Sequence, residues 1–180
     1  MKKSQKQGRE IVTMNADAFR HLYGYHFSEN LALWDKHVMA MSPGQFTQAI
    51  DYSTGSVKHH VVHMMSVDNT WFAGLRGDPI PEPLNPQDFE GREAIRAYWD
   101  TVIQQMRVYL DSLTDEQLCD KPFADGEDED LIVWQVLLQV VNHGTDHRSQ
   151  LLRILHEFGQ KTVSQDYIFY VYDNPLLSTE

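Results

Sequence analysis

Four long stretches of the chain carry apolar residues at alternating spacings of three and four positions, which is the period of one face of an α-helix. They span residues 15–41, 55–74, 92–113 and 131–158. No segment between them shows the apolar–polar alternation that is typical of a half-buried strand. With 180 residues, the chain is long enough to bury four such faces in one core without disulfide or metal support. The pattern predicts an all-α fold, built as a four-helix bundle.

The ends of these stretches carry capping signals. Asn15 can cap the first helix, and a serine or threonine between residues 53 and 56 can cap the second. The Ser-Pro-Gly sequence at 42–44 predicts the end of the first helix. Acidic residues at 125–130 precede the fourth helix and suit the positive end of its dipole. That capping role is favoured over an ion site, because the ligand spacing of an EF-hand is absent.

A proline-rich connection joins the second and third predicted helices. Residues 75–91 hold four prolines, a density that excludes an α-helix and favours extended chain. About 15 residues of polyproline-like chain span roughly 46 Å, whereas a 20-residue helix is only ~30 Å long. The connection can therefore run the full length of the bundle, so that the second and third helices point in the same direction.

The two ends of the chain differ from the helical body. Residues 1–13 are polar and basic, which predicts a flexible tail, and residues 14–180 are predicted to form a single domain. Residues 167–172, Tyr-Ile-Phe-Tyr-Val-Tyr, suit a short strand or a turn of helix. One short segment can bury only one face against its own bundle, so the remaining aromatic surface predicts a homodimer.

The charge distribution argues against nucleic acid or a membrane surface as a partner. The net formal charge is −11, and four of the 15 cations lie in the first nine residues. Eleven cations then remain against 26 acids, so the rest of the chain carries −15 and repels phosphate groups. No signal peptide or transmembrane helix is expected, since no apolar run approaches roughly 20 residues. The single Cys119 suits a reducing compartment, and we expect a cytoplasmic protein.

Histidine is the residue type that points to chemistry, with nine in 180 residues. His143 and His147 are four residues apart on the fourth predicted helix, so their rings lie one above the other on one face. Two such imidazoles can reach one metal ion at ~2.0–2.1 Å. Gly144 stands where a zincin metalloprotease has glutamate, and no Glu-x-x-His of a di-iron carboxylate bundle occurs. The alternative is that His143 and His147 lie at the edge of the apolar face and only form hydrogen bonds to their neighbours.

A third ligand is expected from another helix, because two imidazoles alone bind an ion weakly. His63 lies in the middle of the second predicted helix, and His143 and His147 lie near the middle of the fourth. The three therefore share a level of the bundle whichever way the helices run. Three histidines leave one coordination position open, as catalytic metal sites do. Imidazole does not choose sharply among late first-row divalent ions.

These residues belong to two spaced motifs, Ser56-x6-His63-x7-Trp71 and, about eighty residues later, His143-x3-His147-Arg148-x-Gln150. The pair resembles the DinB/YfiT family of bacterial metal-binding bundles, and the resemblance extends over residues 15–172. It implies an up-down-down-up four-helix bundle, often homodimeric, with His63, His143 and His147 as metal ligands. It also implies zinc or nickel, and members with assigned activities are thiol-dependent transferases and isomerases. Ser149 departs from the glycine often found before the final glutamine, and Asp146 is an unusual neighbour of the second ligand.

Other polar residues near the triad are candidates for proton transfer. His59, one turn before His63, is a rival or fourth ligand or a catalytic group, and Asp146 is the second catalytic candidate. His60 is expected to be a hydrogen-bonded core residue. His26 and Asn30 lie on the inner face of the first helix and are expected in a polar part of the core.

The sequence thus predicts a metal-dependent enzyme. A metal held by three neutral histidines activates a bound water or thiol, so both thiol transfer and hydrolysis of a small-molecule substrate are compatible with the residues. Thiol transfer, with a low-molecular-weight thiol as partner, rests on the family resemblance alone. The alternative is a non-catalytic dimeric bundle, ligand-binding or stress-associated, whose metal is structural or vestigial.

Overall fold

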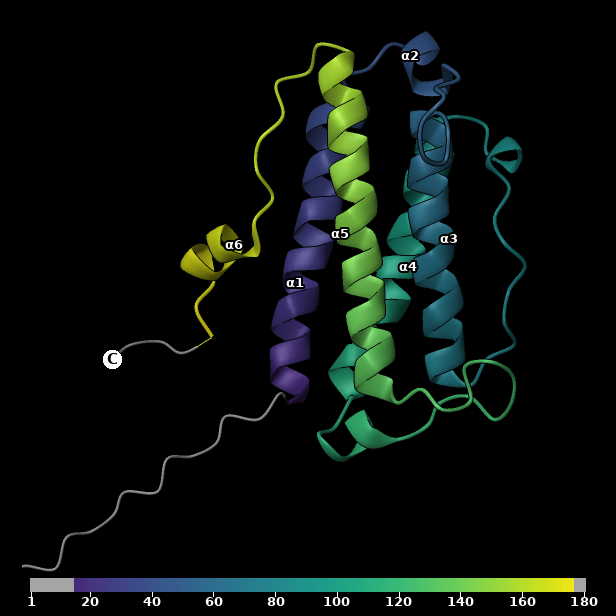
Figure 1. The fold of residues 1–180 in the computed structure, drawn as a ribbon, viewed down its shortest axis with the longest axis vertical. Helices are drawn as coiled ribbons and strands as arrows, with labels where there is room; N and C mark the ends of the chain where they lie inside the picture. Colours follow the sequence, from purple (N-terminus) through teal and green to yellow (C-terminus); the bar gives the residue numbers. More distant parts are fainter. Residues whose placement is uncertain (1–14, 177–180) are drawn as a thin grey trace, which may run out of the picture.

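Helices make up all the regular structure of residues 15–176, the part of the chain that the computed structural model describes. Four are long and lie side by side in Figure 1. They are α1 (Ala16–Leu33), α3 (Val57–Arg76), α4 (Arg92–Ser112) and α5 (Val133–Glu157). The short helices are α2 (Pro43–Thr47), α6 (Tyr167–Asp173) and two 3-10 turns at Pro86–Asp88 and Glu116–Cys119. The prediction of an all-α chain is confirmed for these residues.

The first predicted helix, residues 15–41, is not one regular helix. Asn15 does cap α1, since its side chain accepts the amide of Ala18 at 2.9 Å. At Leu33, however, α1 passes into a π-helical turn, Trp34–Val38. Periodicity could not show this, because a π-turn shifts the register of the apolar face by a single residue.

The first helical stretch ends at Val38, a few residues before the predicted stop at residues 42–44, and these residues instead begin α2. The hydroxyl of Ser42 accepts the amide of Gln45 at 3.2 Å, and the Gln45 side chain accepts the amide of Ser42 at 3.1 Å. This reciprocal pair is a capping box. Pro43 takes the first helical position, where its missing N–H costs no hydrogen bond.

The long helices contact one another around a square. Helix α5 packs against α1 and α3, and α4 packs against the same two helices. Helices α1 and α5 run in the same direction: the Tyr23 hydroxyl donates to the carbonyl of Leu137 at 2.9 Å, and two turns later Asn30 accepts from Arg148 at 2.9 Å. The apolar faces meet in one core, whose members include Phe19, Tyr23, Phe27, Trp34, Phe72, Trp99 and Met106.

The connection from α3 to α4 runs back along α3 (Figure 1). The amide of Leu84 donates to the Ser66 hydroxyl at 2.9 Å, halfway along the helix. Lys58, in the first turn of α3, donates to the carbonyl of Phe89 at 3.1 Å. Helix α4 therefore begins at the same end as α3, and both run against α1 and α5. Apart from the single 3-10 turn, the connection is non-helical.

Residues 167–172 are helical, which decides between the two conformations that the sequence allowed. Helix α6 lies against α1 (Figure 1), where the Tyr167 hydroxyl is 2.8 Å from Nδ1 of His21. Gly24 leaves room for the Tyr170 ring, because a Cβ at that position would overlap its hydroxyl. The other side of α6 is open to solvent, with Phe169 and Tyr172 exposed.

The predicted tail, residues 1–13, lies outside the described residues, so the division into a tail and one domain at 14–180 stays a prediction. Among the helices of residues 15–176, none combines the length and the apolar character needed to cross a bilayer.

Candidate metal centre

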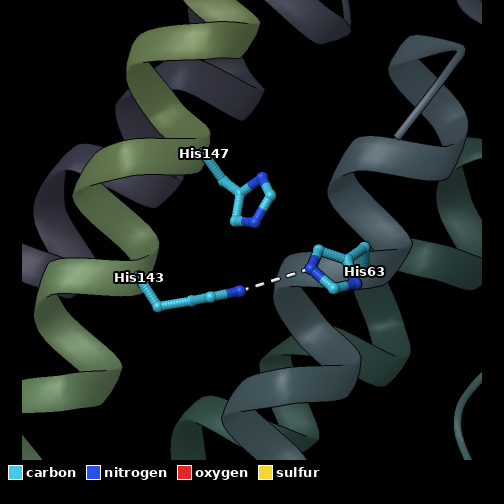
Figure 2. Close-up of side chains that lie close together, drawn as sticks. All are labelled: His63, His143 and His147. Carbon is cyan, nitrogen blue, oxygen red and sulfur yellow. Dashed lines mark hydrogen bonds between the residues drawn. The ribbon is translucent and has the colours of Figure 1, made fainter. Parts of the chain in front are cut away.

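Three histidines from two neighbouring helices converge in the middle of the molecule. Figure 2 shows His143 and His147 extending from α5 toward His63 on α3. Nε2 of His63 lies 3.2 Å from Nε2 of His143, and the centroid of the His147 ring lies 4.6 and 4.3 Å from the centroids of those two rings. One nitrogen from each ring falls within 4.8 Å of the others. The structure therefore brings together the three residues that the sequence predicted as ligands.

Local sequence explains why the rings can converge. His143 and His147 are one turn apart, so they share the face of α5 that contacts α3. Gly144 lies between them in the sequence, on the adjacent face of α5 that packs against α1. A Cβ at this position would lie 2.5 Å from Cε1 and 2.9 Å from Nδ1 of His26. Only glycine therefore allows α1 and α5 to approach this closely at the level of the histidines.

The spacing of the nitrogens fits a metal ion. Two imidazole ligands at ~2.0–2.1 Å from a tetrahedral ion lie about 3.3 Å apart. The 3.2 Å between the Nε2 atoms of His63 and His143 matches that value. The same distance suits an N–H···N hydrogen bond when one ring carries the proton on Nε2. The donor set, three imidazoles and no carboxylate, is one that zinc, nickel and copper accept.

The surroundings keep two of the rings uncharged. Burial lowers the pKa of His143 to about 4, and the neighbouring His147 and His63 add to the shift. Burial, and then His147, also lowers the pKa of His63. Both rings are therefore neutral at pH 7, the form that binds metals. The Nδ1 atoms of His143 and His147 are buried and have no hydrogen-bond partner among the described residues.

The two predicted catalytic candidates lie outside this group. His59 is exposed, and its Nδ1 is 2.7 Å from the hydroxyl of Ser56, the residue that caps α3. With His63, it lines a small cavity of about 230 Å³ between α3 and the proline-rich connection. Asp146 is exposed on α5 and accepts the side-chain amide of Gln150 at 2.9 Å. Neither residue offers a ligand atom to the triad.

His60 differs from its prediction. Its ring is completely buried beside His147, with 5.9 Å between the centroids, yet neither ring nitrogen has a hydrogen-bond partner among the described residues. Burial is the main cause that lowers the pKa of His60, against a smaller opposing effect of the nearby Gln150 side chain. The position of His60 in the apolar stripe of α3 thus predicted its burial correctly, but not its bonding.

A buried polar cluster lies behind the triad, between α1, α3 and α5. Arg148, only 1% exposed, donates to Asn30 at 2.9 Å and to the Thr145 hydroxyl at 3.0 Å, and it lies 3.4 Å from Nδ1 of His26. Nε2 of His26 is 3.5 Å from the carboxylate of Asp68, which is 2% exposed. The expected polar core around His26 and Asn30 is present.

Sequence reasoning did not assign a role to Arg148 or Asp68 in this cluster. Asp68 carried a signal that could have found it, because it is an acidic residue in the apolar stripe of its helix. Arg148 carried the same signal, because it lies four residues after Gly144 and three before Leu151, in the apolar stripe of its helix. Pairing across helices, rather than periodicity along one, makes its burial possible.

Comparison with known proteins agrees with the motifs. No curated protein matches the sequence. The model of the DinB family matches residues 13–175, nearly the whole chain, which confirms the resemblance seen in the histidine motifs. The chain is thus a member of the DinB family.

Proposed function

We propose that this protein binds one divalent transition metal ion, zinc or nickel, through His63, His143 and His147, and that it is a metal-dependent thiol transferase. The observation that carries the proposal is the convergence of three ring nitrogens within 4.8 Å. When bound, such an ion lowers the pKa of a thiol that it coordinates and so supplies a thiolate at neutral pH. Membership of the DinB family supports the choice of a thiol as the nucleophile.

His59 is the residue of this chain best placed to move a proton. The Ser56 hydroxyl accepts the backbone amide of His59, so its own proton can be donated to Nδ1 of the ring. That arrangement leaves the ring proton on Nε2, from which it can be donated to a leaving group. Because His59 and His63 line the same cavity, a small substrate held there is close to both.

The arrangement of the long helices supports the architecture that the family resemblance implies. We infer an up-down-down-up four-helix bundle with residues 77–91 as the crossover. The directions of α1, α3, α4 and α5 and the hydrogen bonds of Leu84 and Phe89 to α3 support it. The exposed thiol of Cys119 is consistent with our inference of a cytoplasmic protein.

Thiol transfer predicts a metal-dependent loss of free thiol. With a neutral epoxide as the electrophile, the sulfur–carbon bond forms, the carbon–oxygen bond breaks, and the thiol proton ends on the oxygen. We expect the metal-loaded protein to consume at least one of glutathione, bacillithiol, mycothiol or cysteine about tenfold faster than His147→Ala does, because a fixed thiolate attacks with a lower entropic barrier.

The thiol assay also separates the competing functions. Equal rates in the two proteins across all four thiols would exclude thiol transfer. Hydrolysis of an ester or amide by the metal-loaded wild type, but not by His147→Ala, would then identify a hydrolase. A protein that holds its metal but is inactive in both assays would be a non-catalytic bundle.

The exposed face of α6 predicts a homodimer. Ile168, Phe169 and Tyr172 are 46, 52 and 71% exposed, while Tyr167 and Tyr170 pack on Tyr25 of α1. Exposed apolar patches of this kind mark protein interfaces. Light scattering at micromolar concentration is expected to give twice the chain mass of 20.9 kDa. The variant Phe169→Ser, Tyr172→Ser should then be monomeric. A wild-type mass near that of one chain would show that this face is not a dimer interface.

A further inference from the structure

An open cavity of about 420 Å³ lies at the C-terminal end of α3, away from the histidines. Trp71 is eight residues beyond His63, which places it about 12 Å further along the helix. The cavity lies between the last turns of α3 and the segment 122–128, which precedes α5. Its volume is in the range of small-molecule sites, ~300–1,000 Å³.

Two aromatic side chains, Trp71 and Phe123, are the largest apolar groups that line this cavity. Phe123 meets Trp71 edge-to-face, with 5.9 Å between ring centroids and 70° between the planes. Phe123 can lie there because residue 74 is glycine: a Cβ at that position would overlap its ring. The aromatic corner formed by Trp71 and Phe123 therefore depends on a close approach between the segment 122–128 and the backbone of α3.

The polar part of the cavity is acidic. Asp78, Asp125, Glu127 and Asp128 line it, and no lysine or arginine does so among the described residues. Asp78 forms an ion pair with Arg76 at 2.6 Å, whereas the other three carboxylates make no ion pair within residues 15–176. Three unpaired negative charges thus lie beside two aromatic rings.

No hydrogen bond ties these acids to the start of α5 among the described residues. The first amide of α5, that of Val133, donates to the carbonyl of Asp120, and the amide before it donates to the Gln135 side chain. Within the described residues, no carboxylate of the acidic run bonds to the first turn of α5. Their favourable position before the helix dipole thus involves no hydrogen bond to the first turn, and Asp125, Glu127 and Asp128 are exposed residues that line the cavity.

We propose that this cavity binds a small organic cation, an ammonium or guanidinium group on an apolar or aromatic body. A cation over an aromatic face is attracted by the ring quadrupole, and Trp is the strongest partner for it. The three carboxylates add Coulomb attraction for a cation and exclude anions. The apolar body fills the corner formed by Trp71 and Phe123. The site is separate from the proposed metal centre and does not depend on it.

Titration calorimetry of the metal-loaded protein with three matched probes tests the proposal. The probes are 2-phenylethylammonium, the neutral 2-phenylethanol and the anion 3-phenylpropionate. We expect the cation to bind, the alcohol to bind at least tenfold more weakly, and the anion not to bind. Equal binding of the alcohol and the cation would overturn the proposal. Displacement of the cation by an equal concentration of Ca²⁺ would also overturn it and indicate an inorganic ion site.

Matched variants locate the site. Trp71→Leu is expected to weaken cation binding at least tenfold. Glu127→Gln should weaken it three- to fivefold and reduce its salt dependence, because the lost charge lies close to the ligand. The control Glu129→Gln changes the same residue type in the same segment, outside the cavity, and should leave Kd unchanged. Equal effects of Glu127→Gln and Glu129→Gln would show non-specific attraction to an acidic surface.

Two further variants test whether binding of the cation requires the metal site and whether it requires the contact between Phe123 and Gly74. His147→Ala should bind the cation with unchanged Kd, and a loss there would assign the cavity to the metal centre instead. Gly74→Ala is expected to displace Phe123 and weaken binding, while circular dichroism confirms that the helices remain. Unchanged binding in folded Gly74→Ala would contradict the role of the aromatic corner.

Discussion

Replacement of His147 by alanine is expected to lower the affinity for zinc or nickel at least about a hundredfold, because it removes one of the three proposed ligands. Loss of a partner that merely orients a ligand already costs 10–100-fold. Elemental analysis of untagged wild-type protein after metal supplementation should give close to one ion per chain, and His147→Ala should give almost none. A wild-type content below a tenth of an equivalent would contradict the metal site.

The same variant should keep its helices. The three histidines are only partly buried, and none belongs to the apolar core. A chain of 180 residues buries a large enough apolar core to be stable without an ion. His59→Ala is the matched control, since His59 lies on the same face of α3 but outside the triad, and it should retain the full metal content. If His147→Ala lost its helical circular dichroism, the metal would be structural.

The second large effect is expected at Arg148. Arg148→Ala should lower the free energy of unfolding by about 3–5 kcal/mol, as removal of one partner from a buried charged cluster does. The substitution leaves buried Asn30 without its donor, and it leaves the buried carboxylate of Asp68 without a nearby cation. Unsatisfied groups of this kind carry the full cost of their desolvation. Urea unfolding of the metal-free proteins measures the difference.

Arg153→Ala is the matched control for this measurement. Arg153 is on the same helix and pairs with Glu157 at 3.2 Å, but its side chain is 62% exposed. Exposed pairs at this spacing contribute ~0.3–0.5 kcal/mol, so the control should remain close to wild type. A loss below about 1 kcal/mol in Arg148→Ala would show that the cluster does not stabilise the fold.

The predictions that hold best are those that depend on spacing along one helix. The i, i+4 separation of His143 and His147 placed both rings on one face, and no later packing could separate them. The level of His63 followed from the lengths of the predicted helices. In the same way, the apolar stripe of α3 located His60 in the interior, and the family motif selected the same three histidines.

Spacing along one helix could not decide what lies across from each face. The sequence left His59 as a rival ligand, and only the rotation of α3 against α5 placed it in solvent, beside Ser56. It also could not show what pairs with Arg148, because that partner, Asn30 of α1, is 118 positions away in the chain. Likewise, the sequence places an acidic run before α5, where it suits the helix dipole. Only the structure shows that Phe123 packs over Gly74 and that the acidic run lines a cavity.

The difference between what the sequence could predict and what it could not has a physical cause. A helix fixes the positions of residues three and four apart through its own backbone hydrogen bonds, so the sequence by itself determined the four helices, their apolar faces and the chelating pair on α5. The rotation of each helix about its axis, and the path of the segments between helices, follow from contacts between residues far apart in the chain. Only the tertiary structure therefore decided that His63, and not His59, faces the pair on α5, that Arg148 pairs with Asn30 behind it, and that an aromatic and acidic cavity forms at the far end of α3.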